Sequence, residues 1–238
     1  MRPTRGRKSR TMRTLLLVAL LAPFFAFAAP RTESRKIKDF TALEASGGVT
    51  LYVKRGPTAL TVEGEPEVIA NWETEVRDGQ LTVRRKSGKS TWRPEKVTVR
   101  VTTPVLERLS AGGGVDATVS DVATSTAFTL SLSGGAKLQM HGVRVETMSI
   151  AASGGVEAVL EGSARSAAIE ASGGVNLHMQ GLQTVSATID ASGGCDLKVR
   201  ASKSLKGKAS GGVSVAVFGD PAELAVDASS AATIDRVN

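Results

Sequence analysis

The side chains of this chain that could do chemistry are carboxylates, two histidines, one cysteine and many serines. Glu170 and Asp190 each lie two residues before a serine of a repeated motif, where paired carboxylates could act as general acid and base or share a cation. His141 and His178 have different offsets from that motif, so a shared metal is not expected. Cys195 fits a small buried residue better than a reactive thiol. The motif serines have no neighbouring base to activate them, so the sequence predicts no catalytic, metal-binding or cofactor-binding residues.

The elements that position these side chains come from a repeat. The motif Ser46-Gly47-Gly48-Val49 returns along the chain and is degraded only near the C-terminus, at residues 229–232. From position 112 onward the motif starts lie 21, 20, 19, 20, 18 and 19 residues apart. A fixed period of this length is typical of a repeat architecture in which each unit stacks on its neighbours.

Within each repeat the apolar residues alternate with polar ones. One phase contains Ile169, Ala171, Gly173, Val175 and Leu177, and the opposite phase holds the motif serine and polar residues. A period of two indicates strands with one buried face. A unit of roughly 19 residues is too short for a propeller blade and has no helical period, but it suits one coil of a solenoid. The sequence therefore predicts an all-β fold, a single-stranded β-solenoid (β-helix).

The paired glycines of the motif are predicted to be structural, because residues without a Cβ permit a bend at the same place in every coil and a close approach of neighbouring coils. A phosphate-binding glycine loop would need a following helix, and none is indicated. These structural glycines are Gly47, Gly48, Gly113, Gly114, Gly134, Gly135, Gly154, Gly155, Gly173, Gly174, Gly193, Gly194, Gly211 and Gly212.

Outward positions should form columns across the coils. One column, following the motif, would contain Thr50, Asp116, Lys137, Glu157, Asn176, Asp196 and Ser214, in which charges of opposite sign and neutral residues alternate. A second column, preceding the motif, would contain Glu170, Asp190, Lys208 and Asp227. Both columns are interpreted first as solvated strand faces.

The N-terminus reads as an export signal. Residues 1–28 contain six basic residues and no acids, followed by an apolar run that ends in small residues, so a signal peptide with cleavage after Ala28 is expected. Removing those six basic residues lowers the net charge from +7 to +1, which does not support nucleic-acid binding. No transmembrane segment is expected in the mature chain, and its location would be periplasmic or extracellular, at the cell surface.

The mature chain is predicted to contain an N-terminal linker at 29–37 and a β-solenoid domain at 38–238. Within the domain, 38–110 would form irregular, wider coils that could also cap one end, and 111–238 the regular repeats. The wider part should contain a short helical turn beginning at Glu65-Pro66 and a hairpin at Asp78-Gly79. Residues 86–94 are interpreted as an exposed loop.

Several of these features resemble one bacterial family. The entry strand Phe40-Thr41-Ala42-Leu43 before Ser-Gly-Gly-Val, the segment Gly79-Gln80-Leu81-Thr82-Val83 and the segment Thr103-Pro104-Val105-Leu106 before the second glycine motif are similar to the putative autotransporter-adhesin head family, or GIN domain. The resemblance covers about residues 38 to 236. It implies a β-helical domain of unknown biochemical activity with an adhesin label, and it brings no catalytic residues.

Two functions stay open at this stage. The preferred one is an exported, noncatalytic scaffold or adhesin-like binding module at the cell envelope, with an envelope protein or a glycan as partner. The alternative is a carbohydrate-active β-helix enzyme, a polysaccharide lyase or hydrolase, that uses Glu157, Glu170 and Asp190. Stacked coils also leave an unpaired ladder at each end, so we expect the thinly covered C-terminal end to pair with a second copy or a partner.

Overall fold

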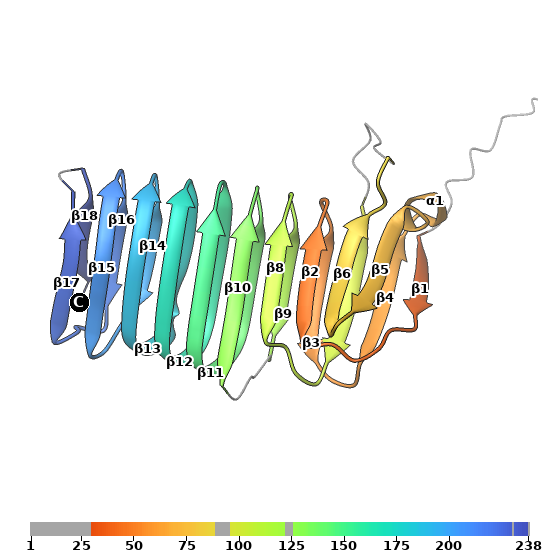
Figure 1. The fold of residues 1–238 in the computed structure, drawn as a ribbon, viewed down its shortest axis with the longest axis horizontal. Coiled ribbons are helices and arrows are strands. Elements are labelled where there is room, and N and C mark those ends of the chain that lie inside the picture. The colour runs from red at the N-terminus through yellow and green to blue at the C-terminus, as the bar shows by residue number, and fades with distance from the viewer. Residues whose placement is uncertain (1–29, 89–95, 122–125, 230, 238) are drawn as a thin grey trace, which may run out of the picture.

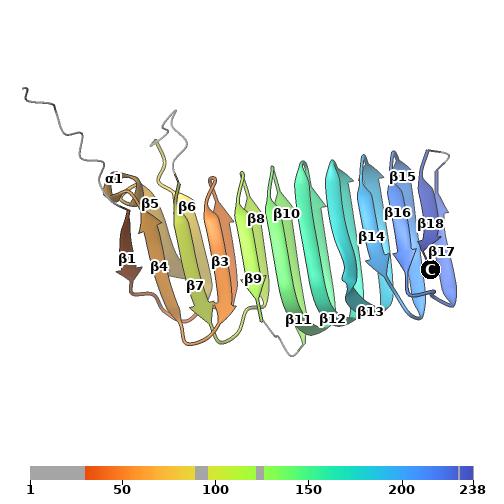
Figure 2. The same cartoon turned by 180° about the vertical axis from the view of Figure 1, so that it is seen from behind.

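Two long β-sheets lie back to back and share a thin apolar core (Figures 1 and 2). The computed structural model describes residues 30–88, 96–121, 126–229 and 231–237. The alternation of buried and exposed residues places one side of every strand in the core, as in β10, where Phe128, Leu130 and Leu132 are buried. The predicted β-solenoid is confirmed.

Sheet A is the sheet that leads into the glycine motifs. In spatial order it contains β5 (Trp72–Arg77), β6 (Gln80–Arg85), β2 (Ala42–Ser46), β8 (Arg108–Gly112), β10 (Ala127–Ser133), the second halves of β11 (Lys137–Ser153), β12 (Val156–Gly173) and β13 (Val175–Gly193), then β15 (Ser204–Gly211) and β17 (Glu223–Ala228). At the glycine motif of each coil, the chain turns from sheet A into the second sheet, sheet B.

Sheet B receives the chain after the motif. It contains β1 (Arg31–Arg35), β4 (Ala59–Gly64), β7 (Thr98–Thr103), β3 (Thr50–Arg55), β9 (Asp116–Ser120), the first halves of β11, β12 and β13, then β14 (Asp196–Arg200), β16 (Ser214–Phe218) and β18 (Thr233–Val237). The strands β11, β12 and β13 run through a corner from sheet B to sheet A without interruption, opposite the glycine turns.

The core is a series of stacked apolar columns. In sheet A the ladder aligns Leu109, Leu130, Ile150, Ile169 and Ile189, and each side chain is at most 2% exposed. Burying a side chain of this size contributes roughly 1.5–3 kcal/mol. Because one such column repeats along the axis, the stability of the regular part comes from contacts between neighbouring coils.

The N-terminal part differs from the expected wider coils. Residues 59–103 pair largely antiparallel: β4 with β7, and β5 with β6 through the predicted turn at Asp78-Gly79, where both residues have positive φ. Such a two-residue turn joins antiparallel strands, whereas a coil requires parallel ones. Together with the helix α1 (Pro66–Ile69), these strands cover the end of the solenoid.

The segment expected to be a linker, 29–37, contains β1, which pairs antiparallel with β4. Arg35, the last residue of β1, is held in place because its guanidinium donates to the carbonyl oxygens of Trp72 at 2.9 Å and of Ile69 at 3.2 Å. The alternation rule missed this strand because its side chains Arg31 to Ser34 are all exposed and show no apolar phase. The expected loop at 86–94 lies mostly outside the described residues.

At the other end, β17 and β18 form the last coil. Their inward side chains Leu224, Val226 and Ile234 are only partly buried, whereas the equivalent Leu205 of β15 is fully buried. The pairing of this end with a second copy or a partner stays a prediction.

Candidate functional site

The outer face of sheet A carries a hollow. It is a shallow groove of about 670 Å³ that crosses the coils from β2 to β13. Most of its outward side chains are small, and many are hydroxyls. We name this surface the serine groove and define its outward residues as Glu44, Ser46, Ser110, Gly112, Ser131, Ser133, Ala151, Ser153, Glu170, Ser172, Asp190 and Ser192.

The ladder register produces the groove. Ser133 aligns with Ser153, Ser153 with Ser172, and Ser172 with Ser192, so the motif serines form one continuous column. Neighbouring strands in a sheet lie about 4.8 Å apart, so hydroxyls repeat at that spacing along the solenoid axis. Because the outward side chains are small, they leave a hollow on the outer face. The larger apolar side chains lie on the opposite side of the strands, in the core.

The carboxylates of the groove lie near its two ends. Glu44 accepts a hydrogen bond from the Gln80 side chain at 2.7 Å. Glu170 and Asp190 are direct ladder neighbours, as the predicted column requires, and Asp190 continues to Lys208 and Lys208 to Asp227. Among the residues that line the groove there is no lysine or arginine, so its fixed charges are negative.

The three acids of the enzymatic alternative do not converge. Glu157 lies in the sheet B half of β12, where its carboxylate pairs with the Lys137 ammonium at 3.1 Å. Glu170 and Asp190 lie on the outer face of sheet A. Since the core separates the two outer faces, Glu157 cannot share a substrate with the other two, and that constellation is wrong.

The other predicted column is confirmed on sheet B. Lys137 lies in the ladder between Asp116 and Glu157, and the column continues through Asn176 and Asp196. His141 belongs to the same sheet and contacts Glu161, with 2.9 Å between Nδ1 and Oε2. His178 lies on the strand β13, beside Val159 and Lys198. In the part of the chain that the structure describes, no group of three or more His, Cys, Asp or Glu residues could hold a metal ion.

The motif glycines occupy the turns between the sheets. The first glycine of every pair has a positive φ, for example Gly173 at +87°, and a Cβ there would lie 3.1 Å from the backbone nitrogen of Gly154 in the preceding coil. The side chain would therefore meet the neighbouring coil, as predicted, but residue 173 is exposed at the corner and does not face the core. The second glycine has a positive φ in the pairs at 48, 114 and 135, and not in the later ones.

Cys195 is buried, as the sequence indicated. Burial raises the pKa of its thiol, and its sulfur contacts the carbonyl oxygens of Ser192 at 3.2 Å and Gly173 at 3.5 Å. A thiol that stays protonated is a poor nucleophile. Cys195 therefore acts as a core residue at the position that Val or Ala fills in the other coils.

The family described as "Putative auto-transporter adhesin, head GIN domain" matches residues 39–221. The chain belongs to the GIN-domain family. This confirms the resemblance found in the sequence and makes the chain an adhesin-like module by family. No curated protein matches the chain.

Solved structures share the GIN-domain fold with this chain. A putative adhesin from Bacteroides fragilis NCTC 9343 has a TM-score of 0.81 at 21% identity, over 87% of this chain and 97% of that chain. A putative lipid binding protein from Parabacteroides distasonis ATCC 8503 has a TM-score of 0.66 at 16% identity, over 88% and 97%. A putative adhesin from Parabacteroides merdae ATCC 43184 has a TM-score of 0.63 at 15% identity, over 88% and 96%. At these identities the likeness is one of fold.

The described part of this GIN domain has no helix long and apolar enough to cross a membrane. The signal peptide expected at 1–28 lies outside the described residues, so its cleavage stays a prediction. The serine groove was only partly visible in the sequence: the positions of Glu170 and Asp190 were recognised, whereas Ser110 and Ser131, which occupy the same column in earlier coils, were not. Extending that column toward the N-terminus would have found them.

Proposed function

We propose that this GIN domain is an exported, noncatalytic binding module of the bacterial cell envelope and that the serine groove binds an extended, uncharged glycan. The observation that carries the proposal is the groove itself, an exposed, shallow and hydroxyl-lined surface that repeats from coil to coil. Membership of an adhesin family supports a binding role.

The shape of the groove favours a polymer over a small molecule. It is a shallow surface across several coils, so one residue of the ligand after another could meet an equivalent set of hydroxyls. Hydroxyl and backbone groups of such a surface can donate and accept hydrogen bonds with the hydroxyls and amides of a sugar chain. The strands beneath are already paired on both sides, so a peptide could not add itself as a further strand on this face.

The charges of the groove select among glycans. Glu44, Glu170 and Asp190 would repel an acidic polysaccharide. No lysine or arginine lines the groove, and Lys208, the ladder neighbour of Asp190, lies outside it. An uncharged or N-acetylated chain avoids this repulsion. The same absence of a lining cation argues against lyase chemistry on acidic sugars, which would have to stabilise the negative charge of its substrate.

The test compares two arginine substitutions in the same strand. Ala151 lies in the middle of the serine groove, and Gln139 is exposed on sheet B, and both belong to β11. Ala151→Arg should reduce binding of the mature protein to insoluble neutral and N-acetylated polysaccharides, measured by co-sedimentation. An acidic polysaccharide, which the unaltered protein should not bind, is the comparison. Gln139→Arg should bind like the unaltered protein. Equal binding by both variants would contradict the assignment of the serine groove as the glycan-binding surface.

A parallel assay addresses catalysis. The same polysaccharides are incubated with the mature protein, and released reducing ends and unsaturated products are measured. No turnover above buffer is expected. Turnover that disappears in Asp190→Asn would replace the binding module with the enzymatic alternative.

Export has its own test. Cell fractionation followed by N-terminal sequencing should find the protein in the periplasm or at the cell surface, beginning at Ala29. Bulk protein in the cytoplasm with an intact N-terminus would contradict the proposed location.

A further inference from the structure

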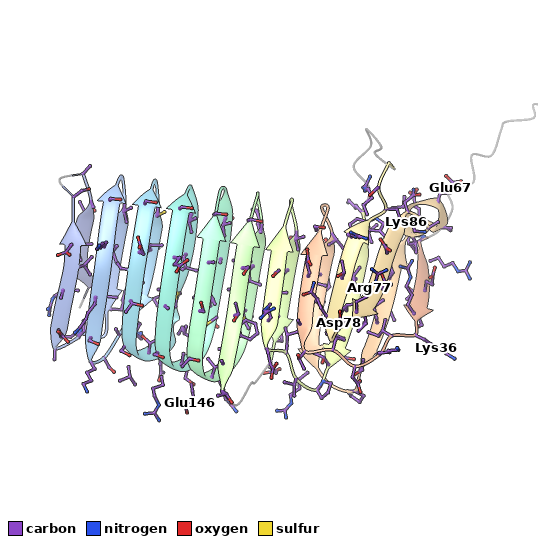
Figure 3. The ribbon with its side chains drawn as sticks, in the orientation of Figure 1. Lys36, Glu67, Arg77, Asp78, Lys86 and Glu146 are labelled. Atoms are coloured by element: carbon purple, nitrogen blue, oxygen red, sulfur yellow. The ribbon has the colours of Figure 1, made fainter. Side chains whose placement is uncertain are left out.

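A second hollow lies at the corner where the chain passes from sheet B back to sheet A. It is a cleft of about 600 Å³, on the edge opposite the glycine turns. Figure 3 shows Glu146, one of its lining residues, at this edge of the molecule. We name it the Arg200 cleft and define it by Ser163, Arg165, Thr184, Val185, Arg200 and Ser202.

Arg200 is held in one orientation. Its Nε donates to the backbone carbonyl oxygen of Gln180 at 2.7 Å, and its guanidinium carbon lies 5.9 Å from the centre of the Phe218 ring. The side chain is half-buried. Beyond these contacts, no protein partner for its two terminal nitrogens is found among the described residues, so the fork of N–H donors is positioned but unused.

The backbone around Arg200 is also fixed. The Thr184 hydroxyl, 4% exposed, donates to the Arg200 carbonyl oxygen. Gly219 lines the same cleft, and a Cβ there would lie 3.3 Å from Cγ of Arg200. The glycine therefore leaves room beside the arginine side chain.

The two arginines of the cleft differ in their partners. Arg165 forms an ion pair with Glu146, with 2.5 Å between Nε and Oε2. Around Arg200, by contrast, the described chain places no carboxylate within ion-pair distance. Asp220, which follows the lining residue Gly219 in the next coil, is paired with Arg236. The cleft therefore carries one positive charge that the described residues do not neutralise.

The wall beside Arg200 is apolar. Val185 is 43% exposed, one of the few large hydrophobic side chains at the surface of the described residues, and Val145 and Ala164 line the same cleft. The hydroxyl residues Ser163 and Ser202 line the same cleft and add hydrogen-bonding groups to it.

We propose that the Arg200 cleft binds the carboxylate or phosphate group of a small amphiphile, with the apolar part of the ligand against Val185. Arginine suits this role because its planar fork can donate two parallel hydrogen bonds to either anion. The acidic lining of the serine groove would repel such an anion, so the two sites should have opposite selectivity.

The experiment is isothermal titration calorimetry on the mature protein at low salt, below the critical micelle concentration of each probe. Octanoate and octyl phosphate should bind with one ligand per chain. Octyl glucoside, which has the chain without the anion, should not bind. Arg200→Gln should weaken binding of both anionic probes at least about tenfold, because a charge-assisted hydrogen-bond pair is lost.

Matched variants separate this site from a general charge effect. Arg165→Gln removes the same charge from the same cleft, but from a paired side chain, and should change affinity less than about threefold. Arg200→Lys keeps the charge without the fork and should fall between the unaltered protein and Arg200→Gln. Thermal melting of each variant checks that the fold is retained.

Inorganic phosphate distinguishes the source of the anion. The proposal requires octyl phosphate to bind more tightly than inorganic phosphate, and Val185→Ser to remove most of that difference. Equal affinity for the two would overturn the apolar part of the site and leave a free oxyanion as its ligand. Octanoate and octyl phosphate binding that is unchanged in Arg200→Gln, or absent from the unaltered protein, would overturn the proposal altogether.

Discussion

The outer faces of sheets A and B are built on the same ladder and present opposite surfaces. On sheet A the regular coils display Ser, Thr and Ala around a groove whose few charges are acidic. On sheet B longer side chains stand next to each other and pair across coils, as Lys137 does with Glu157 and His141 with Glu161. The ladder places residues in columns. The residue types decide whether the side chains of a column pair with each other or remain available to a ligand.

The largest predicted loss of stability comes from one substitution in sheet A. Gly207 occupies the core column that Ile189 fills in the preceding coil, has a φ of +139°, and a Cβ there would lie 1.8 Å from the Ile189 carbonyl oxygen. Gly207→Ala should therefore lower the free energy of unfolding by at least about 3 kcal/mol, because the ladder must shift. Chemical denaturation of the mature protein measures the loss.

Gly212→Ala is the control for that substitution. At Gly212 the nearest atom to a Cβ is the Gly193 carbonyl oxygen at 3.7 Å, an ordinary contact, and φ is not positive. Its loss should stay below about 1 kcal/mol. Similar losses for both variants would mean that sheet A tolerates displacement at residue 207.

The next effect concerns the corner that both sheets share. Gly173→Val should cost about 2–3 kcal/mol, since a β-branched residue is strained at φ +87° and its Cβ would press on Gly154. Ser172→Ala, one residue earlier on the exposed face, should cost less than about 0.5 kcal/mol. Melting temperatures that fall equally and slightly for the two variants would contradict the close approach of coils at this turn.

The smallest predicted effects on stability come from two substitutions in β11, each of which changes the charge of one outer face. Lys137→Glu would place three acids in a row on sheet B, between Asp116 and Glu157, and should cost about 1 kcal/mol at low salt. Ala151→Lys would place a cation beside Glu170 on sheet A and should stabilise by a few tenths of a kcal/mol. Both effects should shrink in 0.5 M salt, and a salt-independent loss in Lys137→Glu would point to packing instead of charge.

Much of the fold follows from local pattern. The alternation through Ile169, Ala171, Val175 and Leu177 identified the buried side of the strands, and the motif spacing set the register of the regular coils. Asp78-Gly79 identified its hairpin because that dipeptide favours the two-residue turn it forms.

The features that were missed depend on contacts that a local pattern does not contain. The strand β1 has no apolar phase, and its pairing with β4 is visible only in the folded chain. The Arg200 cleft depends on how Arg200 meets the backbone of Gln180 and the ring of Phe218 in neighbouring coils. Gly207 offered a signal that could have been used, since it interrupts a column of isoleucines.

The direct stacking of β2 on β8 has a consequence for how the chain folds. Ala42 pairs with Arg108, and the antiparallel cap lies between these two residues in the sequence. Pairing of the first coil with the second therefore closes a loop that contains the whole cap. A loop of 66 residues costs about 1 kcal/mol more closure entropy than a loop of one regular coil. The regular coils, whose partners lie one period away, can associate sooner. Refolding should therefore begin among β11, β12 and β13 and reach the N-terminal end last, although that end is synthesised first.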